Sequence, residues 1–125
     1  MKNKIWIILP AIMLILLVTL VSMTDIQKGN KMPEDIAKIL SHSCYNCHTT
    51  GAKAEDAVKT LDFEIWDEYK ATKRVGLLNE IKEVVEEGNM PPEKFLTKYP
   101  DKAPSEEDRN KIVEWTKEET AKLMK

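Results

Sequence analysis

The chain has 125 residues, which is enough for one domain with a modest core and an N-terminal segment. Its formal net charge is −2 at pH 7, and loss of residues 1–23, which hold two lysines and no acid, would make it −4. A negative balance argues against nucleic acid as a partner.

The N-terminus carries Lys2 and Lys4 ahead of an unbroken apolar run. Residues 5–23 are just long enough to cross a bilayer as a helix. A cleaved signal peptide is the alternative, but that class has a shorter apolar stretch and a small-residue cleavage site, which is not evident here. We expect residues 1–23 to be a retained membrane anchor. The lysines favour the cytoplasmic side, so either fate exports the rest of the chain.

Residues 24–32 are polar and predict a linker, and residues 33–125 are expected to form one domain. Pro33 suits the first turn of a helix. The apolar residues that follow recur at helical spacing, which indicates one buried face: Ile36, Ile39 and Leu40.

Residues 44–48 read Cys-Tyr-Asn-Cys-His, the pattern through which a haem is attached covalently to a chain. Residues three apart share one face of a helical turn, so the sulfurs of Cys44 and Cys47 can meet two arms of one porphyrin. His48 follows on that face, and its imidazole can ligate the iron from the proximal side.

Three other interpretations of this motif fit less well. A structural zinc site needs four ligands, usually from two spaced pairs, and His42 lies too close in sequence to supply a second pair. A thioredoxin-like redox pair needs a preceding strand, whereas the flanking residues read as helical. A disulfide between the chain's two cysteines is the third alternative.

Residues 54–58 predict a short helical piece after the motif. Residues 61–66 alternate like a strand, yet no second alternating run exists to pair with them. We therefore expect a turn that enters a short helix, with Asp62 as its cap and with Phe63 and Trp66 pointing inward.

Residues 73–87 form the clearest expected helix, with one apolar side and Gly88 as its C-cap. A stiff loop should follow, because four of the six prolines lie between residues 88 and 104. Met90 is expected to be the distal iron ligand, since a full helix can return the chain to the far side of the haem. Met32 or an open distal position remain alternatives.

Residues 106–124 predict a closing helix that contains Trp115, with Ser105 and Asp108 as an imperfect capping box. Together these elements predict an all-α domain of about four helices around one haem.

Over about residues 35 to 118 the chain resembles the exported haem-binding domains of bacteria, which are small monohaem c-type cytochromes. The resemblance is carried by residues 44–48 and by the following segments: Leu61-Asp62-Phe63-x-x-Trp66, Gly88-x-Met90-Pro91, Tyr99-Pro100 and the closing run from Ser105 to Trp115. It implies a cytochrome-c-like fold, with thioether attachment at Cys44 and Cys47, His48 as proximal ligand and Met90 as distal ligand. A proline-rich insertion after the histidine is missing, which implies a more exposed haem there.

These features predict a membrane-tethered cytochrome that passes single electrons between partner proteins outside the cytoplasm, and not an enzyme. With both axial positions filled, no coordination position is open for a substrate. The alternative function is a haem-based sensor or small peroxidase in which Met90 is labile. The acidic balance hints that the redox partner presents a basic patch.

Overall fold

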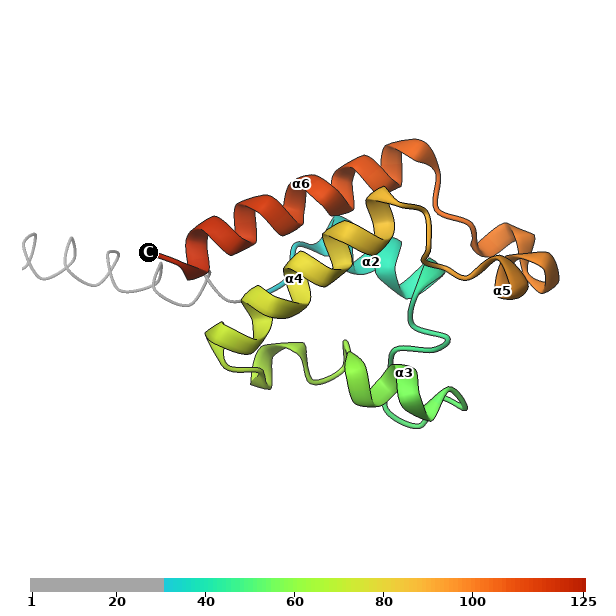
Figure 1. Cartoon of the computed structure of the whole chain (residues 1–125), viewed down its shortest axis with the longest axis horizontal. Helices are drawn as coiled ribbons and strands as arrows, with labels where there is room; N and C mark the ends of the chain where they lie inside the picture. Colours follow the sequence, from blue (N-terminus) through green and yellow to red (C-terminus); the bar gives the residue numbers. More distant parts are fainter. Residues whose placement is uncertain (1–30) are drawn as a thin grey trace, which may run out of the picture. The chain divides into compact units, whose positions relative to one another are not determined.

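The computed structural model describes residues 31–125, so the expected anchor or signal at residues 1–23, and most of the linker at residues 24–32, lie outside the described residues. Residues 32–125 form a compact unit of their own. Within residues 31–125 all regular structure is helical, with no strand (Figure 1). The prediction of an all-α domain is therefore confirmed. None of the helices in this part of the chain has the length and apolar character needed to span a membrane.

The described residues contain five α-helices and two short 3₁₀ helices (Figure 1). In chain order they are α2 (Glu34–Ser43), α3 (Glu55–Thr60), η1 (Trp66–Glu68), α4 (Ala71–Glu86), α5 (Glu93–Lys98), η2 (Pro100–Lys102) and α6 (Glu106–Leu123).

The α5 and η2 helices lie where the sequence predicted a continuous loop, and that prediction was wrong for these residues. Pro92 occupies the N-cap of α5, and Pro100 is the first residue of η2. Proline is tolerated at both positions because the first turn of a helix does not use its backbone N–H groups within the helix. The prolines of this segment therefore start helices as well as stiffen the chain.

The ends of α4 and α6 follow local sequence signals. The C-cap of α4 is Glu87 and not Gly88 as predicted; Gly88 follows it with a φ of 72°, a left-handed conformation that glycine adopts without strain. At the start of α6 the Asp108 N–H donates to the Ser105 hydroxyl at 3.0 Å, and the Ser105 N–H donates back to the Asp108 carboxylate at 3.3 Å. The capping box predicted for this helix is therefore confirmed.

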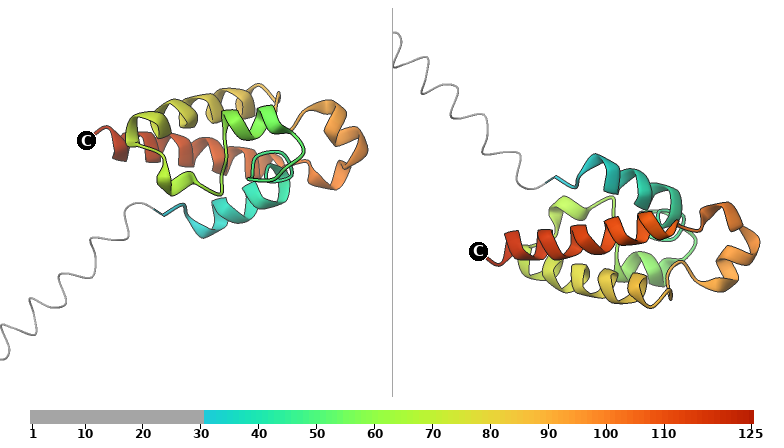
Figure 2. Two further views of the ribbon diagram at one scale, coloured as in Figure 1. Left: turned by 90° about the horizontal axis from the view of Figure 1, so that it is seen from below. Right: turned by 90° about the horizontal axis from the view of Figure 1, so that it is seen from above.

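The α4 and α6 helices pack along each other, and α2 packs against α6 (Figure 2). The α5 and η2 helices contact each other at one end of this pair of long helices (Figure 2). In this arrangement one side of α4 faces the residues that follow α2.

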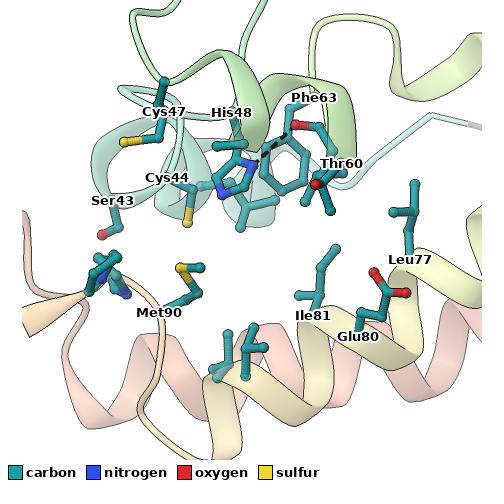
Figure 3. Close-up of a pocket in the computed structure, with 18 of the residues that line it drawn as sticks. Ser43, Cys44, Cys47, His48, Thr60, Phe63, Leu77, Glu80, Ile81 and Met90 are labelled. Atoms are coloured by element: carbon teal, nitrogen blue, oxygen red, sulfur yellow. Dashed lines mark hydrogen bonds between the residues drawn. The ribbon is translucent and has the colours of Figure 1, made fainter.

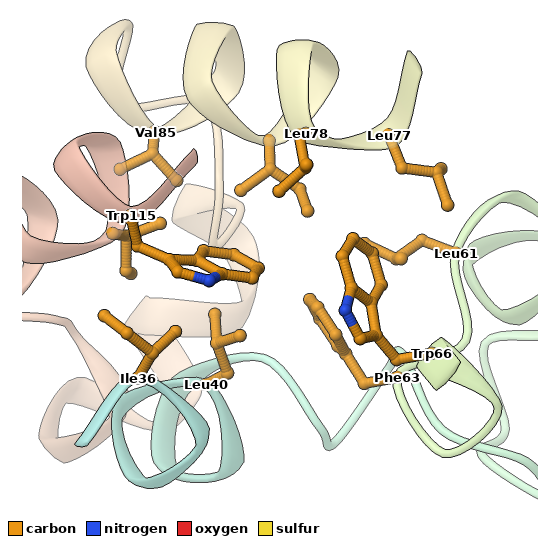
Figure 4. Packing of buried hydrophobic residues seen from close by; sticks show 11 residues of the cluster. Ile36, Leu40, Leu61, Phe63, Trp66, Leu77, Leu78, Val85 and Trp115 are labelled. Carbon is orange, nitrogen blue, oxygen red and sulfur yellow. The ribbon is translucent and has the colours of Figure 1, made fainter. Parts of the chain in front are cut away.

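Three aromatic side chains, Phe63, Trp66 and Trp115, pack among the aliphatic residues of the core (Figure 4). The ring centroids of Trp66 and Trp115 lie 5.7 Å apart, and those of Phe63 and Trp66 lie 6.1 Å apart. The inward orientation predicted for Phe63 and Trp66 is confirmed, since both are buried.

The prediction that Asp62 caps a helix was wrong: the N-cap of η1 is Ile65, which makes no side-chain cap. The Asp62 carboxylate instead accepts hydrogen bonds from the Thr50 N–H and hydroxyl and from the Glu64 N–H.

Candidate functional site

A cavity of about 290 Å³ lies between α4 and the residues that follow α2 (Figure 3). Its walls are almost wholly apolar, because α4 is amphipathic and turns its aliphatic side toward the cavity. The apolar lining consists mainly of Leu40, Leu61, Phe63, Leu77, Ile81, Val84, Val85 and Phe95.

All four site residues predicted from the sequence line this one cavity, namely Cys44, Cys47, His48 and Met90. The first three lie on a single turn that begins where α2 ends. In this turn the N–H groups of Cys47 and His48 both donate to the Cys44 carbonyl, each at 3.1 Å. The turn brings both cysteines and the imidazole to one wall, as their spacing predicted.

Both cysteines are free thiols. Burial in the apolar wall, followed by the neighbouring Cys47, raises the pKa of the Cys44 thiol to about 12. Such a thiol stays protonated, whereas a redox-active or metal-binding cysteine needs a thiolate. Within residues 31–125 no group of three or more His, Cys, Asp or Glu side chains could hold a metal ion. The described residues therefore give the zinc interpretation of the motif no further ligand.

The His48 ring is oriented by a main-chain carbonyl. Its Nδ1 atom lies 3.1 Å from the Leu61 oxygen. A carbonyl oxygen can only accept a hydrogen bond, so Nδ1 carries the proton and Nε2 keeps its lone pair. Figure 3 shows Nε2 directed into the cavity, on the side away from the dashed hydrogen bond. The edge-on Phe63 ring, at a centroid distance of 6.2 Å, further restricts the imidazole.

Met90 reaches the cavity from the wall opposite His48. After α4 the N–H groups of Asn89 and Met90 both donate to the Val84 carbonyl, at 2.9 and 3.3 Å, and this turns the chain back across the helix end. The thioether then points into the cavity from below, toward Cys44 (Figure 3). The structure thus places a sulfur donor across the cavity from an imidazole donor.

The other two donors considered from the sequence lie elsewhere. Met32 packs against the hydrophobic core and is not among the residues that line the cavity. His42 is exposed, and its Nε2 atom lies 2.7 Å from the carbonyl oxygen of Asp101 in η2. Neither side chain is positioned as Met90 is.

Glu80 is a cavity residue that the sequence interpretation missed. It is the only Asp, Glu, Lys or Arg among the described residues that line the cavity, and it is also exposed, which places it at the rim. The sequence did indicate this position. Glu80 follows Leu77 by three residues and precedes Val84 by four, and residues at these spacings lie on one face of a helix.

Residues 51–118 match a protein family described as a haem-binding domain. The match begins shortly after His48, so it covers the cavity residues from Ala54 to Phe95, Met90 included, and leaves out the turn with the two cysteines and His48. No curated protein and no solved structure matches the chain. The cavity residues fit a haem, whose ring needs apolar surroundings and whose iron accepts imidazole and thioether ligands along one axis.

Proposed function

We propose that this chain, which belongs to the haem-binding domain family, is a monohaem c-type cytochrome that transfers single electrons. One observation carries the proposal: two thiols, an imidazole and a thioether converge on one apolar cavity. The proposal adds covalent attachment and electron transfer to the haem binding that the family provides.

Cys44 and Cys47 are the proposed attachment residues. Each thiol would hold the haem through a thioether bond to one vinyl-derived arm of the porphyrin. In such an addition the S–H bond and the vinyl π bond would break, and one C–S bond and one C–H bond would form in their place. The addition conserves atoms and electrons, so it needs no oxidant. Two free thiols on one turn, both at the cavity wall, support this assignment.

His48 and Met90 are the residues that would hold the iron, through Nε2 of the imidazole and through the thioether sulfur. When bound, the haem supplies a one-electron redox couple at its iron. The apolar side chains of α4 would exclude water from that iron, and two protein ligands would leave no coordination position for a substrate. This arrangement favours electron transfer over chemistry on a bound molecule.

The proposed location is the outer face of the cytoplasmic membrane, with residues 5–23 as the anchor. Support comes from the apolar character of that stretch and from the two lysines before it. The proposed partners are redox proteins that accept or donate one electron at this face.

The decisive experiment is to produce the full chain in a host that matures c-type cytochromes, and then to denature it and extract it with acidic solvent. We expect the pigment to stay with the polypeptide, and the mass of the denatured chain to include one haem. The matched control is the double variant Cys44→Ala/Cys47→Ala, from which any pigment should be extracted. A colourless protein, or pigment that leaves the unaltered chain, would refute covalent attachment.

A second candidate function is a sensor or small peroxidase, and the position of Met90 favours it. Met90 is 36% exposed and lies in a loop, so the fold does not enclose this residue completely. Carbon monoxide added to the reduced, untreated protein separates the two functions. Rapid binding would support the labile ligand, whereas no binding supports the electron carrier.

A further inference from the structure

Asp62 is a buried acid whose carboxylate joins two parts of the site. The residue is only 5% exposed, and its carboxylate accepts three hydrogen bonds. The Thr50 N–H donates to Oδ1 at 3.1 Å, the Thr50 hydroxyl donates to Oδ2 at 2.6 Å, and the Glu64 N–H donates to Oδ1 at 2.9 Å. The carboxylate therefore joins Thr50, in the loop after His48, to residues 62–64.

The neighbours of Asp62 on either side both bind His48. The Leu61 carbonyl lies 3.1 Å from Nδ1 of the imidazole. The Phe63 N–H donates to the main-chain carbonyl of His48 at 2.9 Å. Asp62 thus lies at the centre of a three-residue segment that holds both the ring and the backbone of the proposed proximal ligand.

The same segment is fixed to the core. The Asp62 N–H donates to the Tyr69 hydroxyl at 3.0 Å, and the Tyr69 ring lies edge-on to Trp66 with 6.2 Å between centroids. Trp66 is buried in the aromatic core. The carbonyl that faces His48 is therefore held by the folded domain and does not depend on local chain stiffness alone.

We propose that Asp62 is a positioning residue for His48: Asp62 holds the Leu61 carbonyl where this oxygen accepts a hydrogen bond from Nδ1–H, and it so sets the orientation and donor strength of the imidazole. The inference rests on the proposed function, in which His48 ligates iron. A hydrogen bond from the outer nitrogen of a ligating histidine fixes its tautomer and raises its basicity. A more basic imidazole stabilises the oxidised iron and lowers the midpoint potential.

The charge of Asp62 is maintained by the same contacts. The hydrogen bond from the Thr50 hydroxyl holds the pKa of the Asp62 carboxyl below its usual value, burial opposes this, and the N–H groups of Glu64 and Thr50 reinforce it. The carboxylate therefore remains an acceptor for all three donors at neutral pH.

The test compares the haem-loaded full chain with its variants Asp62→Ala and Asp62→Asn by two measurements. One is the midpoint potential, and the other is the ¹⁵N and ¹H NMR signal of His48 Nδ1–H in the reduced protein. We expect Asp62→Ala to shift the potential to a more positive value and to weaken the hydrogen bond seen by NMR. Asp62→Asn should shift both less, because its amide oxygen can still accept the two main-chain N–H groups.

The matched control is Asp67→Asn, which removes an exposed acid from η1, five residues further along the chain, and should leave both measurements unchanged. If Asp62→Ala does not fold, Thr50→Val makes the same test, because it removes one donor and keeps the carboxylate. A positive shift in Thr50→Val supports the inference. An unaltered potential and an unaltered Nδ1–H signal in the folded variant overturn it while the haem-bound wild type still supports the proposed function. Wild type without attached haem would instead refute the proposed function itself.

Discussion

Arg74 and Glu119 form an ion pair inside the helical unit, with 2.7 Å between Nη2 of Arg74 and Oε1 of Glu119. Their side chains are only 2% and 10% exposed. The guanidinium of Arg74 also lies 5.7 Å from the centre of the Trp66 ring. One charged contact therefore joins α4 to α6 beside the aromatic core.

Removing one member of this pair should be costly, because the other charge would remain buried. We expect Glu119→Gln to lower the free energy of unfolding by about 3–5 kcal/mol. Urea unfolding followed by circular dichroism measures the loss. The exposed neighbour Glu118 provides the control, since Glu118→Gln should change stability by less than about 0.5 kcal/mol. A similar small effect for Glu119→Gln would contradict the structural role of the pair.

The role of Met90 can be tested with the substitution Met90→Ala in the haem-loaded protein. We expect the sulfur-to-iron charge-transfer band to disappear and the reduced iron to bind carbon monoxide, because the distal position becomes open. Visible absorption spectroscopy makes both measurements.

Met32→Ala is the control for this substitution, since Met32 packs against the core and not in the cavity wall. It should leave the band intact. A band that survives in Met90→Ala and is lost in Met32→Ala would reverse the assignment.

Glu80 should tune the potential of a bound haem. Its carboxylate lies at the rim of an apolar cavity, where a negative charge favours the oxidised and more positive iron. We expect Glu80→Gln to shift the midpoint potential to a more positive value. Glu83→Gln, on an exposed position of the same helix that does not line the cavity, should shift it much less. Equal shifts in the two variants would mean that the effect comes from net charge and not from position.

Asp62 should make stability depend on pH in acid. Its folded pKa is lowered from an ordinary value of 3.8, so its carboxylate stabilises the fold fully above that value. This contribution is lost as the pH falls below 3.8 and through the lowered folded pKa. The difference in unfolding free energy between wild type and Asp62→Asn should therefore be largest near neutral pH and shrink toward pH 2. Urea unfolding across this range measures it, and a difference that does not change with pH would contradict the argument.

Predictions that rest on short spacings agree well with the structure. The turn at residues 44–48, the capping box at Ser105 and the glycine that follows α4 are each decided by a few neighbouring residues. The amphipathic pattern of α4 likewise indicated which of its sides is buried. The continuous loop expected between residues 88 and 104 was wrong because a proline at the start of a helix resembles a proline within a loop.

The sequence by itself predicted the type of chemistry and determined the local turn that presents three of the four donor groups. Two thiols, an imidazole and a thioether occur at spacings that suit one haem, and the turn that presents three of them is local. Only the tertiary structure decided that these groups share one cavity, that Glu80 lies at its rim and that both chain neighbours of Asp62 contact His48. Arg74 and Glu119 are 45 residues apart in the chain, and no local pattern indicates that they meet. Contacts of this kind depend on how whole helices pack, because their partners are chosen by distance in space and not by distance along the chain.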